Sequence, residues 1–218
     1  MVTAVEDHLL HSPRLGLILS RLQEAFAEEQ GRREEFLRTT SEEQKVEFIN
    51  GEVVPPSPVM LAHDRVSGSL YALLRAHVLR HRLGHVGHEK LLVSLSRNDY
   101  EPDVCFFRGE RADGFLPDQR RFPAPDFVAE VLSESTEAND RGVKLDDYAA
   151  HGVTEYWILD PDQKAVEQYV LAGDAYVLRA RLDSGAISSV SVEGFTLPLA
   201  ALFGDQAHLE CLRRLMGE

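Results

Sequence analysis

Residues 126–133 read DFVAEVLS, an apolar run that surrounds a single internal acidic residue, Glu130. Because hydrophobic residues here do not alternate with polar ones, the run predicts a central strand buried on both faces. A carboxylate in such surroundings is costly unless it is paired or coordinates an ion. Residues 101–107, EPDVCFF, place a second carboxylate, Asp103, directly before another apolar strand. The two carboxylates need a chemical reason, and a metal ion is the most economical one.

Composition sets the outer limits of the interpretation. The 218 residues are 44% hydrophobic and 27% charged, which is typical of a globular protein with a substantial core. No apolar run is long enough to cross a bilayer, and the acidic N-terminus lacks the features of a signal peptide. Cys105 and Cys211 are far apart and outside any metal-type spacing, so we expect reduced packing residues in a cytoplasmic protein without membrane contact.

The formal net charge of -13 argues against strong non-specific affinity for nucleic acid, which usually needs a basic face. It does not exclude a nuclease, because a local basic patch can coexist with an acidic remainder.

The N-terminal third of the chain predicts helices followed by a hairpin. A helical period of apolar residues spans 13–35, and SEEQ at 41–44 matches a capping box that would start a short second helix. Asn50-Gly51 lies between two apolar-rich stretches within 46–54, which is a strong hairpin signal.

The remainder alternates between helices and strands. We expect a long helix over 59–83, ended by Gly84, and a helix over 136–151 that joins two parallel strands in a βαβ crossover. A hairpin near Gly173 follows. The expected strands are 91–96, 102–107, 126–133, 155–160, 166–171, 176–181 and 190–192, with a last helix at 206–215. This pattern predicts one α/β domain around a mixed sheet.

The helix after Glu130 carries Asp140, Lys144 and Tyr148 at i, i+4 and i+8, so the three side chains share one face. That face can turn back over the end of the strand and bring Lys144 to the carboxylates, where it would stabilise charge building on a phosphate. The alternative is a surface pair of Asp140 and Lys144, with Tyr148 at the edge of the core.

Several of these segments, in this order, resemble a known family. They are EFINGEVV at 47–54, His63 ahead of the long helix, PDV at 102–104, EVLSEST at 130–136, Asp140 with Lys144 and Tyr148, and GVTEYWILDP at 152–161. The Pro102-Asp103 and Glu130 pattern resembles the PD-(D/E)XK nuclease superfamily. More closely, residues 46–176 resemble the Uma-type restriction endonuclease family of bacterial domains.

The resemblance implies a restriction-endonuclease-like fold, a mixed β-sheet core flanked by helices, over residues 46–218, with residues 1–45 as an N-terminal helical extension. It implies a Mg²⁺ or Mn²⁺ site formed by Asp103, Glu130 and the Val131 carbonyl, and phosphodiester hydrolysis by a metal-activated water. The superfamily has a lysine two residues after the glutamate, where this chain has Leu132. The resemblance moves that role to Lys144.

Four further residues are accessory candidates: Glu47, His63, Asp140 and Tyr148. Glu47 is either a contributor to the site or an exposed strand residue, and His63 either contacts phosphate or only caps its helix. His77, His81, His85 and His88 have the look of a metal cluster. Gly84 should break the helical register between them, so a solvated helix end is the better interpretation.

Three functional hypotheses follow. The first is a metal-dependent DNA endonuclease that uses Asp103, Glu130 and Lys144. The second is a catalytically silent nuclease-fold domain that binds nucleic acid or protein, which the acidic charge favours. The third is hydrolysis of another phosphate ester on the same scaffold. Because enzymes that cut both strands often present two active sites, we also expect a homodimer.

Overall fold

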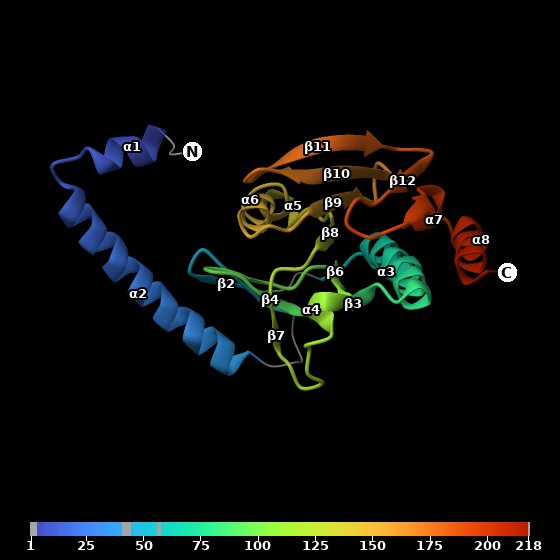
Figure 1. Cartoon of the computed structure of the whole chain (residues 1–218), viewed down its shortest axis with the longest axis horizontal. Helices are drawn as coiled ribbons and strands as arrows, with labels where there is room; N and C mark the ends of the chain where they lie inside the picture. Colours follow the sequence, from blue (N-terminus) through green and yellow to red (C-terminus); the bar gives the residue numbers. More distant parts are fainter. Residues whose placement is uncertain (1–3, 41–44, 56–57, 218) are drawn as a thin grey trace.

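The computed structural model describes residues 4–40, 45–55 and 58–217, and within them the strands form three sheets that pack with helices into an α/β fold (Figure 1). The fold class expected from the sequence is confirmed. No helix in these described ranges is long and apolar enough to cross a membrane.

The largest sheet contains six strands within the described residues, in the order β11-β10-β9-β8-β6-β3. Its strands are β3 (Gly84–His88), β6 (Val104–Arg108), β8 (Phe127–Val131), β9 (Glu155–Asp160), β10 (Ala165–Ala172) and β11 (Ala175–Leu182). β8 pairs antiparallel with β6 and parallel with β9, so the expected βαβ crossover is present. The strand that carries Glu130 is therefore central, as its apolar run predicts.

A second sheet has the order β2-β1-β5-β4-β7. Its strands are β1 (Glu47–Ile49), β2 (Glu52–Val54), β4 (Leu92–Ser94), β5 (Asp99–Tyr100) and β7 (Arg121–Phe122). β1 and β2 form the predicted hairpin, in which Asn50 and Gly51 both have positive φ, at 50° and 87°. Two central residues of positive φ give the turn whose twist matches the flanking strands. β12 (Ala186–Ser188) and β13 (Thr196–Pro198) pair separately.

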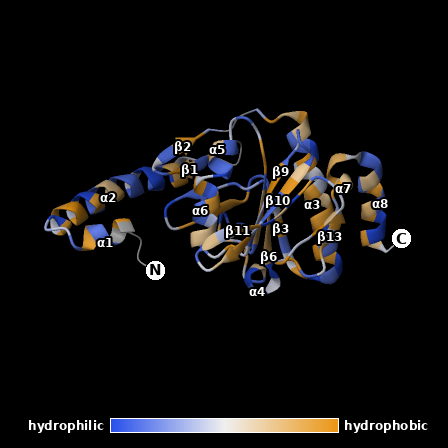
Figure 2. Ribbon diagram, turned by 90° about the horizontal axis from the view of Figure 1, so that it is seen from above, coloured by the Kyte–Doolittle hydropathy of each residue, from blue (hydrophilic) through white to orange (hydrophobic). Residues whose placement is uncertain are grey.

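The helices cover the six-stranded sheet and extend beyond it (Figure 1). They are α1 (Ala4–Leu10), α2 (Leu15–Thr39), α3 (Leu61–His81), α4 (Gly109–Ala112), α5 (Glu137–Asp140), α6 (Val143–Ala150), α7 (Ala200–Phe203) and α8 (Asp205–Met216). α2 leaves the body of the protein as an arm, and its apolar side chains near the N-terminal end face solvent (Figures 1 and 2).

Alternate residues of the central strands are buried against opposite faces. On β8, Phe127, Ala129 and Val131 join the core under α3, α7 and α8, whereas Val128 joins the core under α6 and the second sheet. Because side chains alternate along a strand, Glu130 lies on the same side as Val128. The backbone period therefore directs the Glu130 carboxylate toward α6 and β1.

The structure corrects several expected elements. The helix at 136–151 is divided into α5 and α6 at Gly142, where a Cβ atom would lie 2.8 Å from the Ala138 carbonyl oxygen. β3 replaces the solvated helix end, residues 190–192 are not a strand, and α1 and α7 were not expected. The strands also form three sheets instead of one mixed sheet. The capping box at 41–44 lies outside the described residues.

The other expectations on packing hold. The inner stripe of α3, which includes Val66, Leu70 and Leu74, is buried, and Cys105 and Cys211 are free and buried. The division of the chain at residue 45 remains a prediction.

Candidate functional site

Asp103 and Glu130 are brought side by side by the pairing of β6 with β8. Val104 lies opposite Ala129, so the residues just beyond that pair, Asp103 and Glu130, are neighbours across the two strands. Each carboxylate accepts a hydrogen bond from the other segment: the Asp103 N–H donates to Glu130 Oε2 at 3.2 Å, and the Val131 N–H donates to Asp103 Oδ2 at 2.8 Å. The exposed fractions are only 4% and 2%. This reciprocal bracing fixes both carboxylates.

Lys144 lies among three carboxylates, one of which is Glu130. Its Nζ is 3.2 Å from Glu130 Oε1, 3.2 Å from Asp140 Oδ1 and 3.0 Å from Glu47 Oε1. Glu47 is positioned in turn by the Glu101 N–H, which donates to Glu47 Oε1 at 3.0 Å. The break at Gly142 does not separate Asp140 from Lys144, so the face predicted for this helix forms and points inward.

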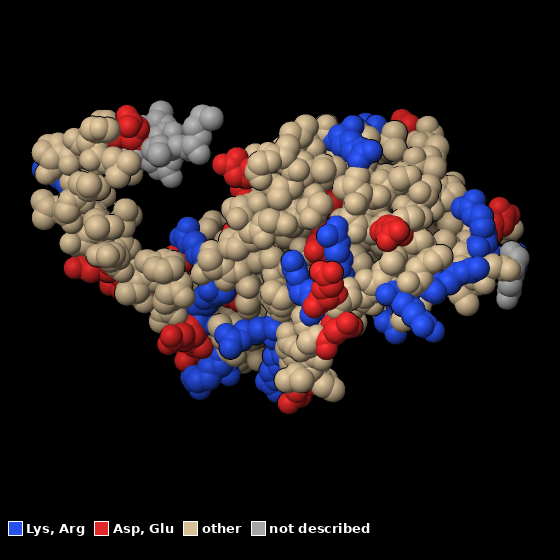
Figure 3. Space-filling view, viewed as in Figure 1, with Lys and Arg blue, Asp and Glu red and all other residues tan. Residues whose placement is uncertain are grey.

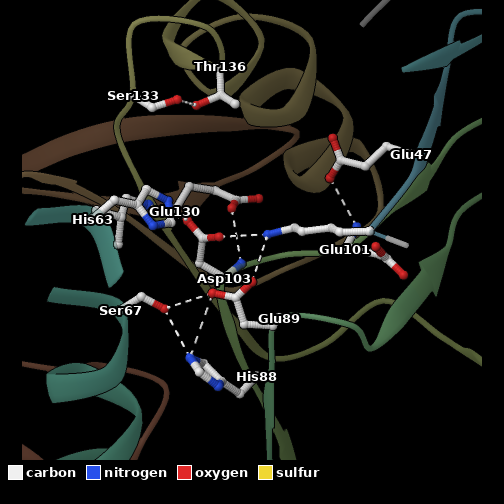
Figure 4. Close-up of polar contacts among 12 residues, drawn as sticks. Glu47, His63, Ser67, His88, Glu89, Glu101, Asp103, Glu130, Ser133 and Thr136 are labelled. Atoms are coloured by element: carbon white, nitrogen blue, oxygen red, sulfur yellow. Dashed lines mark hydrogen bonds and ion pairs between the residues drawn. The ribbon is translucent and has the colours of Figure 1, made fainter. Parts of the chain in front are cut away.

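A second lysine and a histidine contact Asp103 (Figure 4). Lys45 Nζ is 2.7 Å from Asp103 Oδ1, and His63 Nε2 is 3.1 Å from Asp103 Oδ2. His63 comes from the first turn of α3, and Lys45 comes from the segment before β1. Both carboxylate oxygens of Asp103 therefore face a basic group.

Glu89 follows β3 and completes the surroundings of Asp103. Its N–H donates to the Asp103 carbonyl at 3.1 Å, and its Oε2 is 3.6 Å from Lys45 Nζ. Ser67 on α3 contacts both Glu89 Oε1, at 3.4 Å, and His88 Nε2, at 3.0 Å. Figure 4 shows these side chains on one side of Asp103, with Glu47 on the other.

Asp103, Glu130 and Lys144 line a pocket of about 110 Å³. Its charged lining comprises Lys45, Glu47, His63, Asp103, Glu130, Asp140 and Lys144. Ser133, Thr136 and Asn139 from the β8–α5 region complete its polar wall. The carboxylates are thus buried yet reachable from outside, as a reaction centre requires.

Charge around the pocket is unbalanced. Burial raises the pKa of Glu130 well above the usual range of a glutamate, and the Asp103 and Asp140 carboxylates raise it further against the effect of Lys144. Burial also favours a high pKa at Asp103, but its contacts with His63 and Lys45 outweigh burial and hold the Asp103 pKa below its usual range. Burial opposes the charge of Lys144, yet Glu130, Glu47 and Asp140 raise its pKa well above normal.

The donor set fits a divalent metal ion. Asp103, Glu130, Asp140 and Glu47 outnumber the two ammonium groups that contact them. Hard oxygen donors in a small polar pocket are the ligands that Mg²⁺ and Mn²⁺ prefer. The carboxylates alone carry more negative charge than Lys45 and Lys144 neutralise, which a divalent cation would offset.

Most residues predicted for the site lie in it. Asp103, Glu130, Lys144, Glu47, His63 and Asp140 line the pocket, and Val131 is tied to Asp103 through its N–H. Glu47 is not an exposed strand residue, and His63 does more than cap α3, which begins after Met60. Tyr148 is fully buried behind the pocket against the rings of Tyr100 and Tyr156.

Lys45 and Glu89 lie beside Asp103 but were not predicted for the site from the sequence. The position of Lys45 could have been predicted, because Lys45 lies two residues before Glu47. In an extended chain, side chains two residues apart point to the same side. The position of Glu89 could not have been predicted in this way, because it depends on the pairing of β3 with β6. Among the described residues, one group of three ligating side chains is close enough together to hold a single ion. It consists of His63, Glu89 and Asp103.

The other histidines do not gather into one site. His77 Nε2 contacts the Glu193 carbonyl at 2.8 Å, whereas His88 contacts Ser67 and stacks on Tyr71. His85 lies on β3 near Phe115. Among the described residues, His77, His85 and His88 thus have separate partners, and β3, not the expected solvated helix end, carries His85 and His88.

Comparison with known proteins agrees with this fold. A crystal structure described as a putative nuclease belonging to DUF820, from Anabaena variabilis, is similar with a TM-score of 0.68. The similarity covers 82% of this chain and 97% of that chain at 20% sequence identity, so it shows the fold. An uncharacterized protein of Synechocystis is 28% identical over 141 residues, which are 64% of this chain and 79% of that protein.

The sequence pattern of one family matches residues 33–200, which include every pocket residue named above. That family is Uma2, described as "Putative restriction endonuclease". The match covers well over half of the chain and contains both central carboxylates and both lysines. The protein belongs to the Uma2 restriction endonuclease-like family.

Proposed function

We propose that this protein is a metal-dependent endonuclease that hydrolyses phosphodiester bonds of DNA. The observation that supports this most is the braced pair of Asp103 and Glu130, buried on neighbouring strands and open to one small pocket. A purely structural role would not need two buried carboxylates that converge on a cavity. The descriptions of the family and of the Anabaena neighbour as nucleases support the same reaction class.

In this proposal Asp103, Glu130 and the Val131 carbonyl hold Mg²⁺ or Mn²⁺. An ion held there would supply positive charge for the phosphate and make a water molecule more acidic. The protein's own part is to hold the ligands in place. The Val131 N–H fixes Asp103, and Lys144 fixes Glu130 while it also reaches Glu47.

This chain has Leu132 where the superfamily motif has a lysine, and in this proposal Lys144 takes the role of that lysine. It is 4% exposed and is one of the cations that line the pocket. Because three carboxylates keep its ammonium charged and oriented, its position is set before substrate binds. His63 donates to Asp103 from Nε2 when it is protonated, and Asp103 raises its pKa against the effect of burial.

An acidic protein needs a local basic surface to hold DNA. Lys and Arg side chains gather at the lower edge of the face in Figure 3, near the end of α2 and β7. A groove of about 1040 Å³ there is lined by Arg38, Lys90, Arg120 and Arg121, together with Glu34, Glu101 and Asp118. Glu101 lines this groove, and its N–H donates to Glu47, which lines the pocket, so the groove and the pocket adjoin. We propose it as the path of the DNA backbone.

The test is cleavage of supercoiled plasmid and of single-stranded DNA with Mg²⁺ or Mn²⁺. We expect Asp103→Asn and Glu130→Gln each to lower the rate by about a hundredfold or more, because either change removes a charged ligand. Asp174→Asn, in the exposed β10–β11 turn, is the matched control and should cut normally. A chelator should stop the reaction.

DNA cleavage by both Asp103→Asn and Glu130→Gln at the wild-type rate would show that the active site is not this pocket. Absence of cutting together with absence of divalent-metal binding would favour the second hypothesis, a silent nuclease-fold domain. Cleavage of a small phosphodiester but of no DNA would favour another phosphate ester as the substrate.

We further propose that two copies associate through the arm formed by α2. Leu19, Leu22 and Phe26 are exposed on it, and the same helix continues into Phe36, which is buried on the body. The exposed part carries Arg14 and Arg21 toward its start and Glu24 and Glu28 toward its end. Antiparallel pairing of two arms would therefore oppose basic and acidic ends while covering the apolar residues.

Sedimentation of the wild type and of a Leu22→Glu/Phe26→Glu double variant tests this pairing. The wild type should be dimeric and the double variant monomeric, with an unchanged unfolding midpoint. Leu79→Glu, at an exposed leucine on α3, controls for the added charge. A monomeric wild type at micromolar concentration would refute the pairing.

A further inference from the structure

His63, Glu89 and Asp103 converge from three separate parts of the chain. One ligand atom from each lies within 4.8 Å of the other two. His63 comes from α3, Glu89 from the loop after β3, and Asp103 from the segment before β6. A nitrogen and two carboxylate oxygens at such spacing can share one metal ion.

Glu89 is held in this position by more than its side chain. Its backbone has a φ of 65°, a left-handed conformation that a residue other than glycine seldom adopts. The hydrogen bond from its N–H to the Asp103 carbonyl and the contact of Ser67 with Oε1 maintain that conformation. The loop therefore aims the Glu89 carboxylate at Asp103.

His63 is held with equal precision. It is 8% exposed, its Nε2 points at Asp103 Oδ2, and its Nδ1 is buried without a hydrogen-bond partner among the described residues. A histidine whose only role was to cap the helix would instead face the start of α3. This orientation places Nε2 beside Asp103 Oδ2, where an ion held by both residues would take the place of the proton between them.

A cation already stands between the two carboxylates. Lys45 Nζ is 2.7 Å from Asp103 Oδ1 and 3.6 Å from Glu89 Oε2. The Lys45 side chain is one-quarter exposed, in contrast with Lys144, which is locked among Glu47, Glu130 and Asp140. Lys45 can therefore leave its partners toward the pocket without crossing the core.

We propose that His63, Glu89 and Asp103 form a second divalent-cation position, which shares Asp103 with the Glu130 position and which Lys45 occupies when no ion is bound. This inference rests on the proposed function. The mixed nitrogen and oxygen donors favour Mn²⁺ over Mg²⁺, because Mg²⁺ prefers oxygen donors and retained water. Binding of the ion releases the Lys45 ammonium into the pocket, where it can contact a phosphate oxygen.

The test is a titration of this 218-residue protein with Mn²⁺ in the absence of DNA. Calorimetry and electron paramagnetic resonance measure the number of bound ions and their affinities. The wild type should bind two ions per chain. Glu89→Gln should weaken the second ion about tenfold or more, because it removes a charged ligand. Glu52→Gln, at an exposed strand position, is its control and should not change binding.

Replacement of Lys45 should change the affinity for the second ion in the opposite direction to Glu89→Gln. Lys45→Met should tighten the second ion about tenfold, because the ion no longer competes with an ammonium group. Lys164→Met, at an exposed turn, is the matched control. Lys45→Gln offers a second variant if Lys45→Met does not fold, as judged by its circular dichroism. In pulsed resonance spectra, bound Mn²⁺ should show coupling to a nitrogen that His63→Leu removes.

Two outcomes would overturn the inference. One is an affinity for the second ion that is unchanged in Glu89→Gln. The other is an affinity for the second ion that is lower or unchanged in both Lys45 variants. These outcomes are independent of cleavage. DNA cutting with one ion per chain would leave the proposed function intact and remove the second position, whereas two ions without cutting would do the reverse.

Discussion

Two of the clusters of buried charge in the described part of this protein are built differently. One joins Arg33 on α2 to Asp99 on β5, and the other joins Asp103, Glu130 and Lys144 in the pocket. In the first cluster each charge has an equal and opposite partner. In the second, carboxylates outnumber the ammonium groups.

The Arg33 cluster is complete in itself. Arg33 Nε and Nη2 donate to the two oxygens of Asp99 at 2.6 and 2.9 Å, and the remaining donors reach the carbonyls of Leu95 and Ser96. Ser94 also donates to Asp99. Because the guanidinium holds both oxygens of Asp99, this cluster fastens α2 to the second sheet with its opposite charges paired.

The pocket cluster is satisfied only in part. Glu47, Glu130 and Asp140 share the single ammonium of Lys144, and burial raises the pKa of Glu130. The difference teaches that buried charge alone does not identify a functional site. An excess of one sign beside a cavity is the more useful criterion.

The sharpest way to break this comparison is to remove Arg33. Arg33→Met leaves Asp99 buried without its partner, so we expect the free energy of unfolding to fall by about 3–5 kcal/mol. Urea unfolding measures this loss. Arg38→Met removes an exposed pair with Glu35 and should cost less than about 1 kcal/mol. Equal losses in the two variants would remove the distinction between the clusters.

A charge removed from the pocket should act in the opposite direction. Glu130→Gln keeps an acceptor for the Asp103 N–H but relieves repulsion from Asp103 and Asp140. We expect the metal-free variant to gain about 1 kcal/mol of stability while it loses the part of its thermal stabilisation by Mn²⁺ that comes from the Glu130 position. A clear destabilisation of the metal-free variant would show that the pocket is balanced after all.

The smallest expected effect concerns His77, which lies outside both clusters. Burial lowers its pKa below the usual value, and nearby His81 lowers it further, against the hydrogen bond to the Glu193 carbonyl. The unfolded chain therefore takes up the proton first as the pH falls. Stability from this group is full above the unfolded pKa of about 6.5 and declines as the pH falls below it.

His77→Asn should reduce this decline, as measured by urea midpoints at about pH 5.5 and pH 7.5. His8→Asn, at an exposed histidine on α1, is the control. A pH dependence unchanged in His77→Asn would assign the decline to other groups.

Much of the site could be predicted from local sequence. The apolar run around Glu130 predicted a buried central strand, and the spacing of Asp140 and Lys144 predicted one helix face. Both features arise from the periods of strand and helix, which are local properties. The hairpin at Asn50-Gly51 formed for the same reason, since its turn needs only two residues that tolerate positive φ.

Other features could not be read in this way. Gly142 divides the helix at 136–151 because its backbone approaches the Ala138 carbonyl, a contact that periodicity does not encode. β3 forms because Gly84 packs within reach of the Phe107 carbonyl, where any Cβ atom would clash. In both cases a contact between backbones, and not a pattern of side chains, decides the element.

The sequence by itself determined which carboxylates lie buried on the central strands, because an acidic residue inside an apolar strand is visible without a structure. Only the tertiary structure decided what surrounds them. Lys45 and Glu89 reach Asp103 from positions 58 and 14 residues earlier in the chain, through contacts made on folding. Charge balance depends on distance in space, so the excess of negative charge at the pocket appears only once the strands have paired.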